Sequence, residues 1–272
     1  MAGNRLTVHI PQEANPDALI PLLSLMYEQN LAFPDVKTLV AFTKEQGLGS
    51  RSELQNFATV CGLLERDEEG QITLSQVGRT VSQLKPEIRA DLIHFLMYTG
   101  WENRSEASTE LWAYREIVNF LWFRADVDVL SIGPSLNEEV RNKALELFDT
   151  DVSFSPKSIR GARKWLSAVL PPVIEHGTTF SHRHFCPPEL ALLATGWVAQ
   201  QTEGELEIDF LLTPERRELI CKVCLLDSVV LDRVLDWTLP LYPQVMVAGT
   251  NAGVYGRFLR FLKWPESSDL LR

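Results

Sequence analysis

The chain has 272 residues, a length that allows one large domain or two smaller ones. Hydrophobic residues make up 45% of the chain and charged residues 23%, so it is too apolar for a disordered protein and is expected to fold around a core. Asp and Glu number 36 against 26 Lys and Arg, and the resulting net charge of −10 excludes a uniformly basic coat for nucleic acid. A local basic face is still compatible with this balance.

The sequence also gives expectations for the cellular location, the state of the cysteines and enzymatic activity. No apolar run approaches the ~18–20 residues of a membrane span, and residues 1–12 contain no hydrophobic signal segment, so we expect a cytoplasmic protein with no membrane partner. Four cysteines do not form a disulfide framework and are expected as free thiols. Because no glycine-rich phosphate loop, nucleophile elbow or zinc-protease motif occurs, the sequence predicts a protein that is not an enzyme and that needs no cofactor.

The first elements expected along the chain are helices. Apolar residues recur at spacings of three and four between residues 17 and 30, which predicts a largely buried helix. A second helix follows and ends at Gly47, where a residue that tolerates positive φ is favoured. Ser50 is expected to cap a third helix, with Glu53 as its capping-box partner.

Two short strands are predicted next, around a tight turn at Gly70, and a further helix follows them. Helix, turn, helix, β-ribbon and helix within about fifty residues is the order of a winged helix-turn-helix. Residues 50–81 resemble the recognition helix, the wing and the following run of winged-helix proteins, with the run LSQVGR at residues 74–79. The resemblance covers residues 34–84 and implies a unit that binds DNA or, in some members, protein.

The rest of the chain is expected to be mostly helical. Residues 85–101 and 108–123 form two apolar, aromatic helices that are expected in the core. Asn137 is expected to cap the next helix, and a further helix is predicted over residues 155–170. The alternating strand at residues 206–210 is followed by a helix that opens at Thr213 and Pro214. A basic, aromatic closing helix is expected beyond residue 254.

We therefore predict a mainly α fold with small β-ribbons, arranged as tandem winged-helix domains. Residues 1–130 are expected to form an N-terminal winged-helix domain with extra aromatic helices. Residues 131–272 are expected to form a C-terminal helical domain with a degenerate second winged-helix unit at about residues 135–225, because strand, Leu-Thr-Pro and helix echo the first unit.

The strongest electrostatic signal lies in the predicted helix over residues 155–170. Its basic residues share one broad face, and residues 152–190 hold five basic side chains against two acidic ones. Such a face, with hydroxyls at a helix N-terminus, is suited to phosphate contacts. Phosphate contact is the leading interpretation, a solvated helix surface comes second, and an acidic protein partner comes third. The candidate nucleic-acid-binding residues of this region are Ser155, Lys157, Ser158, Arg160, Arg163, Lys164 and Arg183.

The first unit contributes two weaker candidates. Arg51 is suited to backbone contact and Gln55 to an adenine edge, but the acidic wing that follows repels phosphate. A zinc site is a separate alternative, for which the chain offers Cys221 and Cys224 in one cluster and His182, His184 and Cys186 in another. The competing interpretation is that the thiols pack within an apolar helix and that the histidines lie on a polar strand face. We predict no metal.

The leading functional hypothesis is a non-enzymatic, DNA-binding or DNA-associated protein that contacts the backbone of double-stranded DNA. The alternative is an acidic winged-helix adaptor or scaffold subunit that binds other proteins in a DNA-processing or defence complex. In architecture and charge the chain resembles the paired winged-helix subunits of chromosome-organising complexes. Its aromatic middle and the SPKS run at residues 155–158 resemble winged-helix accessory proteins of bacterial anti-phage systems. The sequence does not give an oligomeric state.

Overall fold

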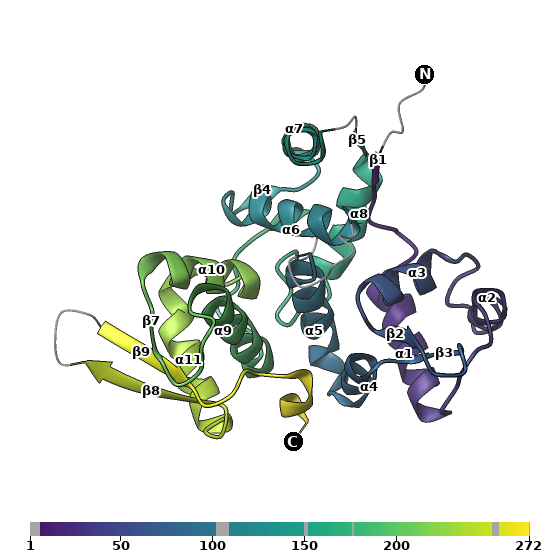
Figure 1. Cartoon of the computed structure of the whole chain (residues 1–272). Coiled ribbons are helices and arrows are strands. Elements are labelled where there is room, and N and C mark those ends of the chain that lie inside the picture. The colour runs from purple at the N-terminus through teal and green to yellow at the C-terminus, as the bar shows by residue number, and fades with distance from the viewer. Residues whose placement is uncertain (1–5, 102–108, 150–151, 176, 252–255, 272) are drawn as a thin grey trace. The chain divides into compact units, whose positions relative to one another are not determined.

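The computed structural model describes residues 6–101, 109–149, 152–175, 177–251 and 256–271. The chain forms two compact units, residues 1–181 (unit 1) and 182–272 (unit 2), whereas the sequence suggested a boundary at residue 130. The fold is mainly helical with small sheets, which confirms the predicted fold class at this level (Figure 1). Among the described residues, no helix combines the length and the hydropathy that crossing a membrane requires.

The first part of unit 1 contains three helices, a β-hairpin and a fourth helix. Asn15 and Asp35 cap the first two helices through their side chains, and Gly47 and Gly70 take φ values of 70° and 79° at the predicted helix end and hairpin turn. Phe33 forms an antiparallel bridge with Ile72, which ties the segment between the first two helices to the hairpin. The elements are α1 (Pro16–Glu28), α2 (Val36–Glu45), α3 (Glu53–Val60), β2 (Leu64–Arg66), β3 (Ile72–Leu74) and α4 (Gln76–Gln83).

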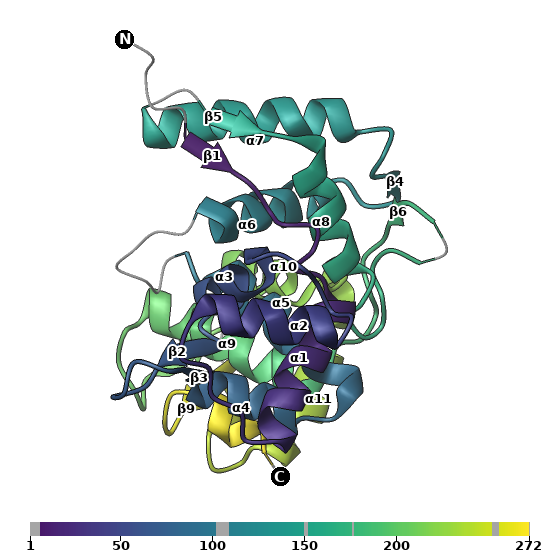
Figure 2. The ribbon, with the colours of Figure 1, turned by 90° about the vertical axis from the view of Figure 1, so that its right-hand side faces the viewer.

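The second part of unit 1 is built around α8 (Pro156–Leu166), which packs on α5 (Pro86–Thr99), α6 (Thr109–Trp122) and α7 (Gly133–Phe148). The aromatic residues of α5 and α6 are mostly buried, as predicted. Strand β1 (Leu6–Val8) runs parallel to β5 (Val152–Phe154), so the N-terminal segment lies beside a strand almost 150 residues later (Figure 2). Strands β4 (Val127–Asp128) and β6 (Thr179–Phe180) form a short antiparallel pair.

Unit 2 combines three helices with a three-stranded antiparallel sheet in the order β7-β9-β8. Its central helix is buried on every side from Leu190 to Ala199, and a Cβ added at Gly196 would lie 2.4 Å from Pro265 Cγ, so this approach requires glycine. The elements are α9 (Pro188–Thr202), β7 (Asp209–Leu211), α10 (Pro214–Cys224), α11 (Leu231–Thr238), β8 (Met246–Asn251) and β9 (Gly256–Phe261).

The expected closing helix is wrong, because residues 256–261 form β9. Basic residues three apart favoured a helix in the sequence, but the buried Leu259 and Phe261 alternate with the exposed Arg260, and this period of two places them on the two faces of a strand. Hydrogen bonding to β7 on one side and β8 on the other stabilises the strand. The spacing of the basic residues was therefore not sufficient to predict a helix in this segment.

Three helix termini also differ from expectation. Helix α3 begins at Glu53, so Ser52 and not the expected Ser50 occupies its N-cap position. Helix α7 begins at Gly133, so Asn137 lies inside the helix rather than at its cap. Pro134 fixes the start of α7 because its φ is preset for the first turn. Helix α8 ends at Leu166 instead of residue 170, and the backbone N–H of Leu170 donates to the Asp91 carboxylate at 2.8 Å.

Candidate nucleic-acid interface

Helix α8 presents its four basic residues on its solvent side. Lys157, Arg160 and Lys164 are exposed and Arg163 is half-buried, while the positions between them face the core. None of the four takes part in an ion pair among the described residues. The Lys164 ammonium instead donates to the backbone carbonyl of Gln12 at 3.4 Å. The predicted basic face is thus present and largely uncompensated.

The buried side of α8 is held by residues 6–14, which we call the N-terminal arm. The Ser158 hydroxyl accepts the backbone N–H of Ile10 at 3.2 Å, and the Trp165 indole N–H donates to the carbonyl of Ala14 at 3.0 Å. At Gly161 the arm comes so close that an added Cβ would lie 2.9 Å from Ile10 Cγ2. The arm therefore fixes the rotation of α8 about its own axis. This rotation determines that the basic side chains of α8 face the solvent.

The sequence indicated a short extended segment at residues 6–11 but not where this arm packs. Val8, Ile10 and Ala14 are buried, but nothing local in the sequence indicates a parallel partner as distant as β5. The arm also reaches the start of α3, because Glu13 lies 3.5 Å from Arg51 across an exposed ion pair. Arg51 thus borders the same arm as the basic face of α8, but its charge is partly neutralised there.

The two ends of α8 differ electrostatically. Ser155 occupies the N-cap position with a half-exposed side chain that makes no capping hydrogen bond, so its hydroxyl is not used by the helix. Near the other end, the pKa of Asp128 lies below its usual value, chiefly because Thr178 donates a hydrogen bond to it and in smaller part because Arg163 is near. The charge of Arg163 is therefore the most compensated of the four.

Three of the residues selected from the sequence are buried structural groups. The Ser158 hydroxyl is hydrogen-bonded to the N-terminal arm, and the Gln55 amide shares a hydrogen bond of 3.0 Å with the Thr43 hydroxyl. Arg183 belongs to unit 2, where its Nε donates to the backbone carbonyl of Cys224 at 2.7 Å. Because these side chains do not reach the surface, we leave them out of the proposed interface.

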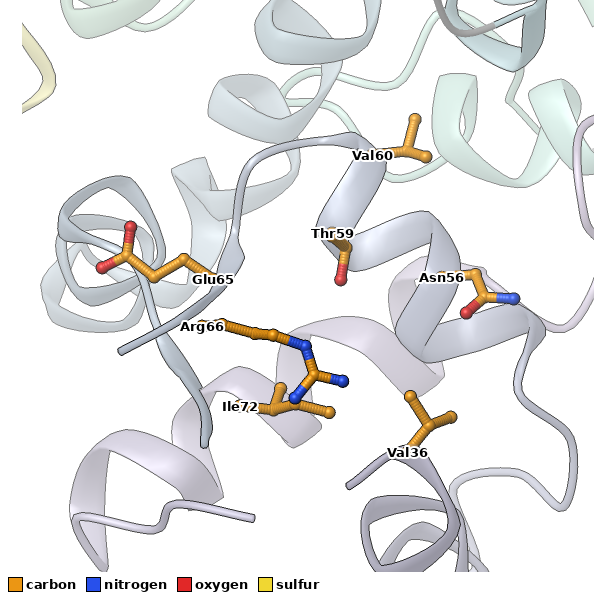
Figure 3. A pocket seen from close by; sticks show the side chains of 7 residues that line it. All are labelled: Val36, Asn56, Thr59, Val60, Glu65, Arg66 and Ile72. Atoms are coloured by element: carbon orange, nitrogen blue, oxygen red, sulfur yellow. The ribbon is translucent and has the colours of Figure 1, made fainter. Parts of the chain in front are cut away.

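Helix α3 and the hairpin of unit 1 offer a different surface. A hollow of about 360 Å³ lies between α2, α3 and the two strands, and Arg66 extends across it while Glu65 points away (Figure 3). Its floor is apolar, with Val36, Val60 and Ile72 among the lining residues. The hairpin tip exposes Asp67, Glu68 and Glu69, so its charge disfavours phosphate.

The thiols of unit 2 are buried together. Cys186 and Cys224 are hydrogen-bonded to each other, and burial raises the pKa of Cys221 to about 12 and that of Cys224 well above its usual value. Both groups therefore remain protonated near neutral pH. Within the ranges that the structure describes, no three His, Cys, Asp or Glu side chains are arranged to hold a metal ion, although His182 and His184 lie in these ranges.

No family model matches the chain, and no curated protein or solved structure matches it either.

Proposed function

We propose that this protein binds double-stranded DNA non-enzymatically, through phosphate contacts made by Lys157, Arg160, Arg163 and Lys164 on α8. The observation that carries the proposal is that four cations share the solvent side of one helix and take part in no ion pair among the described residues, in a chain of net charge −10. Asp128 near Arg163 compensates this face only in part, and exposed cations of this kind release counterions from a phosphate backbone on binding.

The proposed contact fixes position and affinity rather than sequence. Lys and Arg bind backbone oxygens, and the unused Ser155 hydroxyl lies at the end of the same helix. The N-terminal arm supports this role because it holds α8 rigidly from the opposite side. Arg51 extends the surface along the arm as a weaker contact, since Glu13 competes for it.

We also propose tandem winged-helix units, at positions that differ from the expected ones. In unit 1, α1, the bridge at Phe33, α2, α3 and the β2–β3 hairpin follow the winged-helix order. In unit 2, α9, β7, α10, α11 and the β8–β9 hairpin follow the same order, so the second unit would span residues 188–261 rather than 135–225. In this assignment α8 lies in unit 1 but outside both winged-helix segments.

The test is binding of the full chain to a mixed-sequence duplex across a salt titration. With about four phosphate contacts, the logarithm of the affinity is expected to fall with the logarithm of salt concentration at a slope of about −3 to −4. Changing all four residues to Glu is expected to abolish binding. Failure of the unchanged protein to bind at low salt would overturn the proposal.

A matched pair of double variants separates a specific face from overall charge. The first double variant, Lys157→Glu with Arg160→Glu, changes two exposed cations of α8. The second, Lys37→Glu with Lys44→Glu, changes two exposed cations of α2, so both variants alter the net charge by the same amount. The α8 pair is expected to lower affinity at least tenfold more than the α2 pair. Equal losses would mean that net charge, and not the α8 face, controls binding.

A protein-binding adaptor is the second candidate. The observation that favours it is that neither α3 with its hairpin nor α11 carries a free basic face, since the hairpin tip is acidic and α11 exposes Asp232 and Asp236. An adaptor shows no DNA affinity at low salt, so the same titration distinguishes the two functions.

A further inference from the structure

The exposed side of α11 carries a row of side chains at a spacing of four residues. Short 3₁₀ turns, Ser228–Val230 and Leu239–Leu241, extend this helix at both ends. Val229 is 80% exposed, Trp237 48% and Leu241 41%, and Arg233 lies between them on the same side. Large apolar groups are thus presented to solvent on both flanks of one arginine.

The neighbouring row on α11 is already satisfied within unit 2. Arg257 binds Asp236 at 2.8 Å and Asp232 at 3.5 Å, and Arg217 also binds Asp232. Arg233 takes part in no ion pair among those of the described residues. The row therefore combines a cation that still lacks a charged partner with an aromatic face, which Phe185 supports at a ring-centroid distance of 5.8 Å.

This row is complementary to itself. We propose that α11 forms the interface of a homodimer, in which the α11 of a second copy packs antiparallel to it. A two-fold axis on the exposed side of α11, midway between Arg233 and Trp237, places Val229 opposite Leu241 of the other copy and Arg233 opposite its Trp237. Each apolar group then meets an apolar group, and each guanidinium lies against an indole, where a cation–π contact is favourable.

The antiparallel orientation follows from the charges. A parallel pairing in register would place the two Arg233 guanidinium groups against each other, and like charges in contact are repulsive. Nucleic acid does not suit this face, because Asp232 and Asp236 lie beside the row. One helix face is small compared with the ~1,200–2,000 Å² buried in stable complexes, so the dimer is weak and depends on concentration.

The first experiment is sedimentation equilibrium of the full chain over a wide range of concentration, without DNA. The unchanged protein is expected to dimerise, and Val229→Asp and Trp237→Ala are each expected to weaken the association at least tenfold. Val229 is so exposed that its replacement leaves the fold intact. The control is Val247→Asp, which changes a 38% exposed valine on β8 outside the row and is expected to leave the association unchanged.

A monomer at every concentration would overturn the proposal, and so would a dimer that survives Val229→Asp. Because no nucleic acid is present, either result is independent of the proposed DNA binding.

A second experiment tests the orientation by disulfide trapping. Val229→Cys mixed with Leu241→Cys is expected to form a cross-linked dimer, because the two positions face each other across the axis. Neither variant alone is expected to do so. In the antiparallel pairing, position 229 of one copy is offset from position 229 of the other by twelve residues along the helix, or about 18 Å, and a disulfide requires Cα atoms within about 7 Å. Cross-linking of Val229→Cys alone at the same rate would contradict the antiparallel pairing.

Discussion

Helix α8 of unit 1 and the arginines of unit 2 use positive charge in opposite ways. The basic residues of α8 take part in no ion pair among the described residues. In unit 2 four arginines are instead neutralised pairwise, as Arg216–Glu203, Arg217–Asp232, Arg257–Asp236 and Arg260–Asp209. The net charge of −10 therefore does not exclude a local positive field on α8, and ion pairing as well as composition determines where such a field lies.

The difference has a physical consequence for each region. An exposed ion pair contributes about 0.2–1 kcal/mol to folding and cancels its own field at a distance. A free cation contributes little to folding and keeps its field for a ligand. Changes of charge on α8 should therefore alter binding without altering stability, and changes of charge in unit 2 should do the reverse.

The largest effect is expected from the residue that anchors α8. Trp165 is fully buried, packs near Phe57 with ring centroids 6.3 Å apart, and donates to the carbonyl of Ala14. Trp165→Ala is expected to lower the free energy of unfolding by about 3–5 kcal/mol and to weaken DNA binding, because α8 loses its fixed orientation. Chemical denaturation measures the first effect and the salt titration the second.

Trp237→Ala in unit 2 is the matched control for Trp165→Ala. Trp237 is 48% exposed, so its replacement leaves a smaller void and is expected to cost much less stability. Equal losses for the two tryptophans would contradict the assignment of Trp165 as the anchor.

A smaller effect is expected where the N-terminal arm crosses α8. Gly161→Ala adds a Cβ at 2.9 Å from Ile10 Cγ2 and 3.0 Å from the Ile10 carbonyl oxygen, so the arm must shift. The expected cost is about 1–3 kcal/mol, with faster proteolysis within residues 6–14. Gly133→Ala is the control, because a Cβ there meets nothing within 4 Å and is expected to be neutral or slightly stabilising. An arm equally protected in both variants would rule out the close contact.

The third prediction tests the pairing in unit 2. Arg257→Gln removes the contacts with Asp232 and Asp236 and is expected to lower the free energy of unfolding by about 1 kcal/mol without changing DNA affinity. Lys157→Gln with Arg160→Gln is expected to show the reverse, with stability unchanged within about 0.5 kcal/mol and a lower affinity. If both variants change the same property, the contrast between the two regions fails.

Local signals in the sequence predicted the local structure well. Gly47 and the turn at Gly70 predicted the end of α2 and the hairpin, and the structure confirms both. The spacing of the basic residues also predicted a basic face on α8. These features depend only on residues close in the chain, within one or two helical turns. The local sequence is therefore sufficient to predict them.

Long-range pairing was not predictable in the same way. The arm meets α8 across about 150 residues, and Gly161 reveals its role only when Ile10 lies beside it. Ser158 and Arg183 counted as polar surface in the sequence, but tertiary contacts bury both of them. The same limit applies to β9, whose strand pairing with β7 and β8 overrode the helical spacing of its charges.

The smallest effect is expected from acidification of unit 2. The pKa of Asp232 lies below its usual 3.8, first because Arg217 donates a hydrogen bond to it and then because Arg217 and Arg257 attract its charge. A carboxyl whose pKa is lower in the folded state stabilises the fold above the unfolded value, and this contribution is lost as pH falls through the folded value. Asp232→Asn is therefore expected to destabilise the protein slightly at neutral pH, and its difference from the unchanged protein should shrink as the pH falls below the ordinary value of 3.8 and through the lower folded value. Denaturation curves of both proteins at several pH values measure this difference, and a gap that persists or widens in acid would show that the Arg217 and Arg257 contacts do not depend on the charge of Asp232.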